Sequence, residues 1–161
     1  MQLLFVCTGN TCRSPMAEVI AKAAAAERHL GDITALSAGT SAWEGAPASD
    51  GALLVALEHG LALETHRARS LSRDVVAAAD LVLTMGPHHA ERAVALGGAG
   101  KTFLLSQYAS HGGDSTPIAD PFGGDLDAYR TTFDELSRAI GKVLDRVAAE
   151  DFFERELGEK R

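Results

Sequence analysis

Hydrophobic residues occur in short continuous runs that alternate with segments of helical periodicity. Runs at 3–6, 33–38, 81–83 and 102–105 are typical of strands buried on both faces of a parallel sheet. The segments 16–28, 50–59, 72–79, 87–96 and 128–156 are predicted to be helices. This alternation predicts an α/β fold, a three-layer sandwich with a central four-stranded parallel sheet and helices on both faces.

Residues with strong conformational preferences mark the expected boundaries. Ser14 is expected to cap the first helix, Pro15 to lie in its first turn, and Gly31 to follow its end. The Gly- and Pro-rich segment 106–125 predicts a long loop, a feature that is often functional. Near the end of the last helix, the pair 152–153 consists of two phenylalanines, which predicts packing against another element.

Length and charge restrict the class of protein. The 161 residues fit a single domain spanning 1–161, and 15 Lys and Arg against 22 Asp and Glu give a net charge of −7. This acidic balance argues against broad nucleic-acid binding, and no apolar run approaches the ~20 residues of a membrane span. The start MQLLFVC is too short for a signal peptide, and two cysteines do not build a disulfide scaffold. We therefore expect a cytoplasmic protein without nucleic-acid or membrane partners.

The most informative segment follows the first predicted strand. Residues 7–14 read CTGNTCRS, and we call them the cysteine loop. Backbone N–H groups at the start of a helix make an anion site, and the same position lowers the pKa of a thiol. Arg13 supplies a fork of donors suited to phosphoryl oxygens, and Ser14 is placed to donate a hydrogen bond to the Cys7 sulfur. The pattern predicts a phosphate-binding loop with a thiolate nucleophile, rather than a small buried cysteine.

The string VCTGNTCRSPMAE resembles the signature of the low-molecular-weight protein tyrosine phosphatases, whose loop reads Cys, five residues, Arg, then Ser or Thr. The likeness extends along nearly the whole chain, including the sequence SAGT at 37–40, Trp43 and the pair Asp120-Pro121. The resemblance implies that Cys7 is the nucleophile, Arg13 the phosphate clamp and Asp120 the general acid. It also implies that Asn10 and Ser37 hold the loop in shape. The expected substrate-binding residues are Thr8, Gly9, Asn10, Thr11, Cys12, Ser14, Trp43 and Phe122.

Asp120 also fits this role on its own sequence context. The following proline biases Asp120 towards an extended backbone, which suits a carboxyl group that overhangs the loop. The alternative interpretation is a simple turn aspartate. Asp114, Asp125 and Asp127 lie on or beside the same segment and are the competing candidates.

Two positions bear on the substrate. Thr11 stands where tyrosine-directed members often carry a larger branched aliphatic residue, and Phe122 is followed by glycine rather than by a second aromatic residue. A slimmer, more polar pocket suits a guanidinium better than a phenyl ring. These features resemble the bacterial protein-arginine phosphatases of the family and imply that Thr11 is the selectivity residue. The expected partners are phosphorylated proteins, with inorganic phosphate as product.

Other features leave alternatives open. Cys12 is interpreted either as a small residue packed behind the loop or, by resemblance, as a resolving thiol that forms a disulfide with oxidised Cys7. The six histidines include no pair at i, i+4, so we expect no metal and no cofactor, and the pair His88-His89 is expected to be solvated.

Particular residues distinguish the rival functions. A phosphotyrosine phosphatase is the main enzymatic rival, because Thr11 and one glycine carry the distinction. Arsenate reductases on this fold relay electrons through cysteines well downstream, and this chain has none after Cys12. A non-enzymatic anion-binding or redox-sensing module has no need of both a nucleophile and an acid.

Overall fold

The computed structural model describes residues 1–160 and is built around a four-stranded parallel sheet in the order β2-β1-β3-β4. The strands are β1 (Gln2–Cys7), β2 (Thr34–Gly39), β3 (Leu81–Thr84) and β4 (Thr102–Leu104). The predicted strands and their parallel pairing are confirmed, with boundaries shifted by one residue or so.

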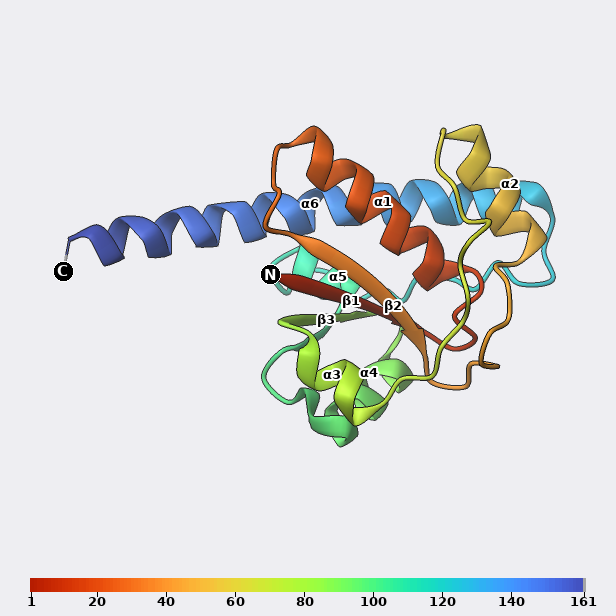
Figure 1. Ribbon diagram of the computed structural model, residues 1–161, viewed down its shortest axis with the longest axis horizontal. Coiled ribbons are helices and arrows are strands. Elements are labelled where there is room, and N and C mark those ends of the chain that lie inside the picture. Colours follow the sequence, from red (N-terminus) through yellow and green to blue (C-terminus); the bar gives the residue numbers. More distant parts are fainter. Residues whose placement is uncertain (161) are drawn as a thin grey trace.

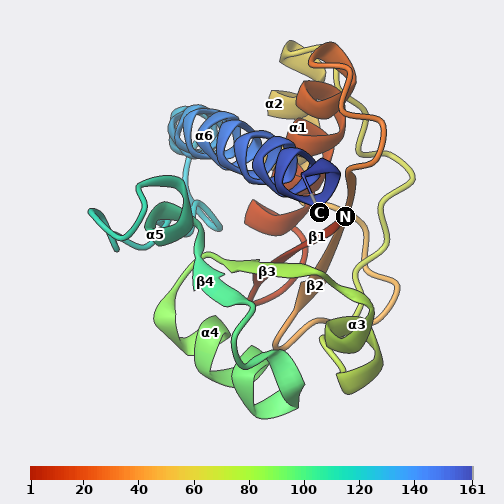
Figure 2. The same cartoon turned by 90° about the vertical axis from the view of Figure 1, so that its left-hand side faces the viewer.

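Helices cover both faces of the sheet (Figures 1 and 2). One face carries α1 (Arg13–Glu27), α2 (Asp50–Glu58), α5 (Leu105–Ala109) and the long α6 (Leu126–Glu159). The other face carries α3 (Arg73–Ala78), α4 (Pro87–Ala93) and the π-helical turn η1 (Val94–Gly98). The predicted three-layer sandwich is therefore confirmed.

The central position of β1 in the sheet explains why its residues 3–6 are all apolar. Leu3 and Phe5 point into the core shared with α1 and α6, whereas Leu4 and Val6 point into the smaller core shared with α3 and α4. Successive side chains of a strand face opposite sides, so a strand between two helical layers needs apolar residues at every position.

Three expectations about the helices were wrong. Ser14 does not cap α1, because the helix begins at Arg13 with Cys12 in the N-cap position, and the Ser14 hydroxyl lies against the Cys7 sulfur instead. Part of the predicted loop 106–125 is the short helix α5, whose buried Leu105, Tyr108 and Ala109 have helical spacing. The far end of α6 extends beyond the body of the protein, where Phe152 and Phe153 are about two-thirds exposed instead of packed.

The carboxyl end of β1 lies at the point where the strand order of the sheet reverses. From β1 the chain passes to β2 on one side of the sheet and later to β3 on the other, so β1 ends where the strand order reverses. In open parallel sheets, ligands bind at such a switch point, beyond the carboxyl ends of the strands. Cys7 is the last residue of β1 and lies level with Gly39 of β2. Among the described residues, no helix is long and apolar enough to span a membrane.

Candidate active site

The cysteine loop wraps closely around the end of β2. The amides of Thr40 and Ser41 donate to the carbonyl oxygens of Cys7 and Thr8, at 3.0 and 2.9 Å. A Cβ atom on Gly39 would lie 2.5 Å from the Thr8 carbonyl oxygen and 2.9 Å from the Asn10 nitrogen. Only glycine permits this approach, so Gly39 sets the height at which the loop sits above the sheet.

Asn10 is fully buried in the middle of the loop and adopts a left-handed backbone conformation with φ of 55°. Its side-chain amide donates to Ser14 Oγ at 2.9 Å, and its Oδ1 accepts the Arg69 backbone N–H at 2.9 Å. Its carbonyl oxygen accepts a hydrogen bond from His66 Nε2 at 2.7 Å. These bonds offset the strained conformation and fix the curve of the loop.

Ser37 lies on β2 and is linked to the loop through Arg69. The Ser37 hydroxyl donates to Glu18 Oε1 on α1 at 3.0 Å, and its carbonyl oxygen accepts the Arg69 Nε–H at 2.9 Å. Arg69 in turn gives its backbone N–H to Asn10, as described above. The sequence did not point to Arg69 or His66, which approach the loop from a segment more than 50 residues away.

The Cys7 sulfur is enclosed by groups that stabilise its negative charge. Its Sγ lies 2.8 Å from Ser14 Oγ, as the sequence predicted. The Ser14 hydroxyl, the backbone amides of Ser14 and Asn10 and the Arg13 charge all lower the pKa of the thiol. Burial opposes them and is the larger effect, so the pKa of Cys7 is raised, not lowered as the sequence indicated.

Arg13 and Asp120 meet at the mouth of the loop. Arg13 is 7% exposed; its Nη1 donates to the carbonyl oxygen of Ile118 at 2.9 Å, and its Nη2 lies 3.6 Å from Asp120 Oδ2. The Asp120 side chain is about half exposed, and its Oδ1 accepts the Phe122 amide at 3.1 Å. Asp120 therefore overhangs the loop, with one carboxylate oxygen towards Arg13.

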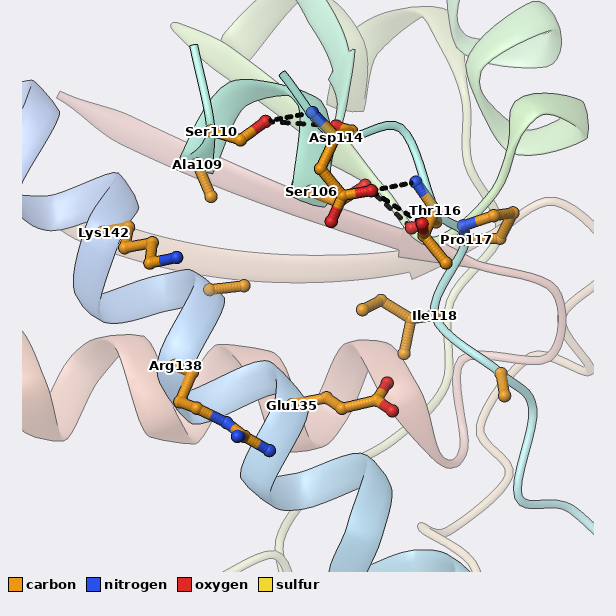
Figure 3. Close-up of a pocket in the computed structure, with 12 residues that line it drawn as sticks. Ser106, Ala109, Ser110, Asp114, Thr116, Pro117, Ile118, Glu135, Arg138 and Lys142 are labelled. Atoms are coloured by element: carbon orange, nitrogen blue, oxygen red, sulfur yellow. Dashed lines mark hydrogen bonds between the residues drawn. The ribbon is translucent and has the colours of Figure 1, made fainter. Parts of the chain in front are cut away.

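The competing aspartates are engaged elsewhere. Asp125 caps α6 by accepting the Ala128 amide, and Asp127 pairs with Arg130. Asp114 lines a separate cavity of about 500 Å³ beside α5 and α6. There its carboxylate accepts hydrogen bonds from Thr116 (Figure 3). Of the four candidates, Asp120 alone lines the cavity beside Cys7.

That cavity, which we call the cysteine pocket, has a volume of about 230 Å³. It is lined by Cys7, Thr8, Gly9, Thr11, Cys12, Arg13, Asp120 and Phe122. Asn10 and Ser14 lie beneath this surface and support it. Trp43, which the resemblance placed among the substrate-binding residues, is 85% exposed and does not line the pocket.

Cys12 is a buried free thiol on one wall of the cysteine pocket. Its Sγ lies 3.1 Å from Ser49 Oγ and 3.5 Å from the hydroxyl of Tyr129 on α6. Gly51 makes room for Tyr129, because a Cβ there would lie 2.5 Å from the tyrosine ring. Cys12 is thus packed behind the loop against hydroxyl groups from α2 and α6.

Of the histidine pair on α4, one member is not solvated as expected. His88 is exposed, but His89 is only 6% exposed, and its Nε2 lies 2.9 Å from the hydroxyl oxygen of Thr8 in the cysteine loop. Burial and the Arg13 charge lower the pKa of His89 to about 4. Among residues 1–160, no cluster of three or more His, Cys, Asp and Glu is arranged to hold a metal ion.

Comparison with known proteins agrees with this geometry. The family model "Low molecular weight phosphotyrosine protein phosphatase" matches residues 2–152. A low molecular weight protein-tyrosine-phosphatase, PtpB of Staphylococcus haemolyticus, is 42% identical over 89% of this chain and 97% of its own length. The protein-arginine-phosphatase of Geobacillus stearothermophilus is 38% identical over 92% and 97%.

A solved structure gives the same result. The C7S mutant of YwlE arginine phosphatase, with a phosphorylated active site serine, superposes with a TM-score of 0.84 at 35% identity and covers 92% of this chain and 96% of its own. Fold and site define a phosphatase with a cysteine at the end of the first strand. The chain belongs to the low molecular weight phosphotyrosine protein phosphatase family.

Proposed function

We propose that this protein hydrolyses phosphoarginine on proteins, with Cys7 as nucleophile, Arg13 as phosphate clamp and Asp120 as general acid and base. The observation that carries the substrate class is the lining of the cysteine pocket. Two threonines, Thr8 and Thr11, line it close to Cys7. Hydroxyl oxygens accept the N–H groups of a guanidinium, whereas a phenyl ring gains nothing from them.

The proposed reaction has two steps, transfer of the phosphoryl group to Cys7 and hydrolysis of the cysteinyl phosphate. Cys7 loses its proton to solvent, and its thiolate attacks phosphorus, so that an S–P bond forms as the P–N bond breaks. Asp120 gives a proton to the departing guanidine nitrogen. Water then attacks the phosphorus, Asp120 takes the proton of the water, and the S–P bond breaks to release inorganic phosphate and the Cys7 thiolate.

Charge stabilisation comes from the protein itself. Arg13 and the loop amides face the phosphoryl oxygens, where negative charge develops, and they act in a buried site where such contacts are strong. The hydrogen bond from Arg13 Nη1 to the Ile118 carbonyl oxygen fixes the guanidinium, so little reorganisation is needed when the phosphoryl group enters. The phosphorylated serine of the YwlE mutant supports phosphoryl transfer to the residue at this position.

The second candidate is a phosphotyrosine phosphatase of the same mechanism. The aromatic side chain of Phe122 lines the cysteine pocket and is 71% exposed, which offers a surface for a phenyl ring. The PtpB relative at 42% identity also favours this candidate. In contrast, the glycines at 123–124 after Phe122 leave the pocket without a second aromatic wall.

The test is kcat/KM on a phosphoarginine protein and on a phosphotyrosine peptide, with Cys7→Ser as the blank. Phosphoarginine is expected to be the better substrate, and Thr11→Ile to reverse or reduce that preference by filling the pocket beside Cys7. A preference for phosphotyrosine in the unmodified protein would overturn the substrate class and leave the mechanism standing. If the unmodified protein turned over both substrates no faster than Cys7→Ser, the result would instead favour a non-enzymatic anion-binding module.

A further inference from the structure

His89 is a buried residue of the first turn of α4 that touches the cysteine loop from a face opposite to α1. Its only side-chain hydrogen bond among the described residues joins Nε2 to the Thr8 hydroxyl oxygen at 2.9 Å. Thr8 directly follows the nucleophile, and its side chain is exposed. A buried imidazole therefore holds an exposed hydroxyl at the residue next to Cys7.

The surroundings of the ring decide which way this hydrogen bond runs. His89 Nδ1 is fully buried and has no partner within residues 1–160. A buried N–H without an acceptor is rarer in proteins than an unmet acceptor, so the proton belongs on Nε2. The low pKa of His89, about 4, keeps the ring neutral at ordinary pH. Nε2–H thus donates to Thr8 Oγ1.

Because His89 donates, the Thr8 hydroxyl can still accept one hydrogen bond and donate another. With one lone pair bound to His89, the oxygen keeps a second lone pair and its own proton for a bound molecule. Thr8 lines the cysteine pocket and also a neighbouring cavity of about 480 Å³ formed with Pro87, His88 and Pro117. Thr8 and Arg13 are the two residues that line both cavities, so Thr8 contributes to the surface beside Cys7.

We propose that His89 is a positioning residue, which fixes the Thr8 hydroxyl so that its oxygen accepts an N–H of the substrate guanidinium. This inference rests on the proposed function, and it adds a second element of substrate selection besides Thr11. A phosphotyrosine side chain has no N–H to offer, so the contact favours phosphoarginine alone. A neutral imidazole matters as well, because an imidazolium at this point would repel the guanidinium.

The test is a double-mutant cycle with Thr8→Val and His89→Leu, measured as kcat/KM on a phosphoarginine protein and on 4-nitrophenyl phosphate. Each variant is expected to lose about tenfold more activity on phosphoarginine than on the aryl phosphate, the size of one hydrogen bond to a charged group. The double variant is expected to lose no more than either single one. His89→Gln, which keeps an N–H donor, is expected to recover part of the loss. Glu91→Gln, on the exposed face of α4, serves as the control.

Three results would overturn the inference. Equal losses on both substrates would show that His89 supports folding of the loop and does not select the substrate. Losses that multiply in the double variant would show that His89 and Thr8 act separately. If both the unmodified protein and His89→Leu turn over phosphoarginine well, the inference about His89 fails and the proposed function stands. If the unmodified protein does not act on phosphoarginine, the proposed function fails first.

Discussion

Arg13 and Asp120 are positioned by the same short stretch of backbone. Arg13 Nη1 is bound to the carbonyl oxygen of Ile118, and its Nη2 lies 3.6 Å from the carboxylate of Asp120, two residues further on. The proposed phosphate clamp and the proposed proton donor therefore move together if this stretch moves. Within the proposed mechanism, the distance between them is fixed before a substrate arrives.

Replacing Asp120 tests the proton donor. Asp120→Asn keeps the shape of the side chain but removes the transferable proton, and kcat is expected to fall roughly a hundred- to ten-thousand-fold. Competitive inhibition by inorganic phosphate is expected to persist, because Arg13 keeps its bond to Ile118. Asp114→Asn is the matched control, since Asp114 binds Thr116 in a separate cavity. A variant at Asp120 with more than a tenth of the original kcat would contradict the assignment.

Replacing Ser14 tests the stabilisation of the Cys7 thiolate. The Ser14 hydroxyl lowers the pKa of Cys7, so Ser14→Ala raises that pKa and leaves less thiolate at neutral pH. The rate of alkylation of Cys7 by iodoacetamide at pH 7 is expected to drop roughly tenfold, as for a lost hydrogen bond to a charged group. Cys12→Ser in both proteins leaves Cys7 as the single thiol, and Ser14→Thr, which keeps the hydroxyl, serves as the control. An unchanged pH profile of alkylation would show that the contact does not stabilise the thiolate.

A glycine substitution tests how tightly the loop is seated. Gly39→Ala places a methyl group against the Thr8 carbonyl oxygen and the Asn10 nitrogen, neither of which can yield without moving the loop. We expect a loss of stability of about 1–3 kcal/mol in urea unfolding, as for other overpacked sites, together with a large fall in kcat/KM. Gly31→Ala meets nothing within 4 Å and is expected to leave both quantities unchanged. Equal behaviour of the two variants would contradict the close packing.

The buried His89 predicts acid sensitivity. The pKa of His89 is lowered from 6.5 to about 4 in the folded protein. Between these two pH values the imidazole is protonated in the unfolded chain but neutral in the folded chain. Stability should therefore be complete above pH 6.5 and decline as the pH falls towards 4, by an amount on the order of 2 kcal/mol. His89→Leu is expected to flatten this decline in urea unfolding between pH 4 and 7. An NMR titration of the His89 ring with a midpoint near 6.5 would refute the prediction.

Cys12 carries a prediction about oxidation. If Cys12 is a resolving thiol, hydrogen peroxide first converts Cys7 to a sulfenic acid, which then condenses with the Cys12 thiol to a disulfide and water. Activity lost to a brief peroxide pulse should return with dithiothreitol. In Cys12→Ser, whose hydroxyl cannot form the disulfide, a second peroxide oxidises the Cys7 sulfenic acid to sulfinic acid, which dithiothreitol does not reduce, so the loss is expected to become largely permanent. Equal recovery in both proteins would leave Cys12 with its packing role against Ser49 and Tyr129 only.

The sequence predicted the contacts that are local to the cysteine loop, such as Cys7 with Ser14, because they follow from one strand, one turn and one helix start. Asp120 was placed at the site by family resemblance, since no physical rule links two residues more than 100 positions apart. His66, Arg69 and Tyr129 were missed for the same reason. His89 was missed despite an available indication: it lies one helical turn before the buried Ala93, on the face that α4 turns to the core.

The site depends on contacts between residues far apart in the sequence, which are synthesised at different times. Cys7, the proposed nucleophile, is synthesised before most of the residues that surround it. Its surroundings are completed much later, when Ile118 reaches Arg13 and Tyr129 on α6 reaches Cys12. Domains fold as units during synthesis, so the reactive loop gains its final shape only after most of the polypeptide has emerged. Nascent chains of this protein are therefore expected to gain activity late and abruptly, and truncation before α6 to abolish it.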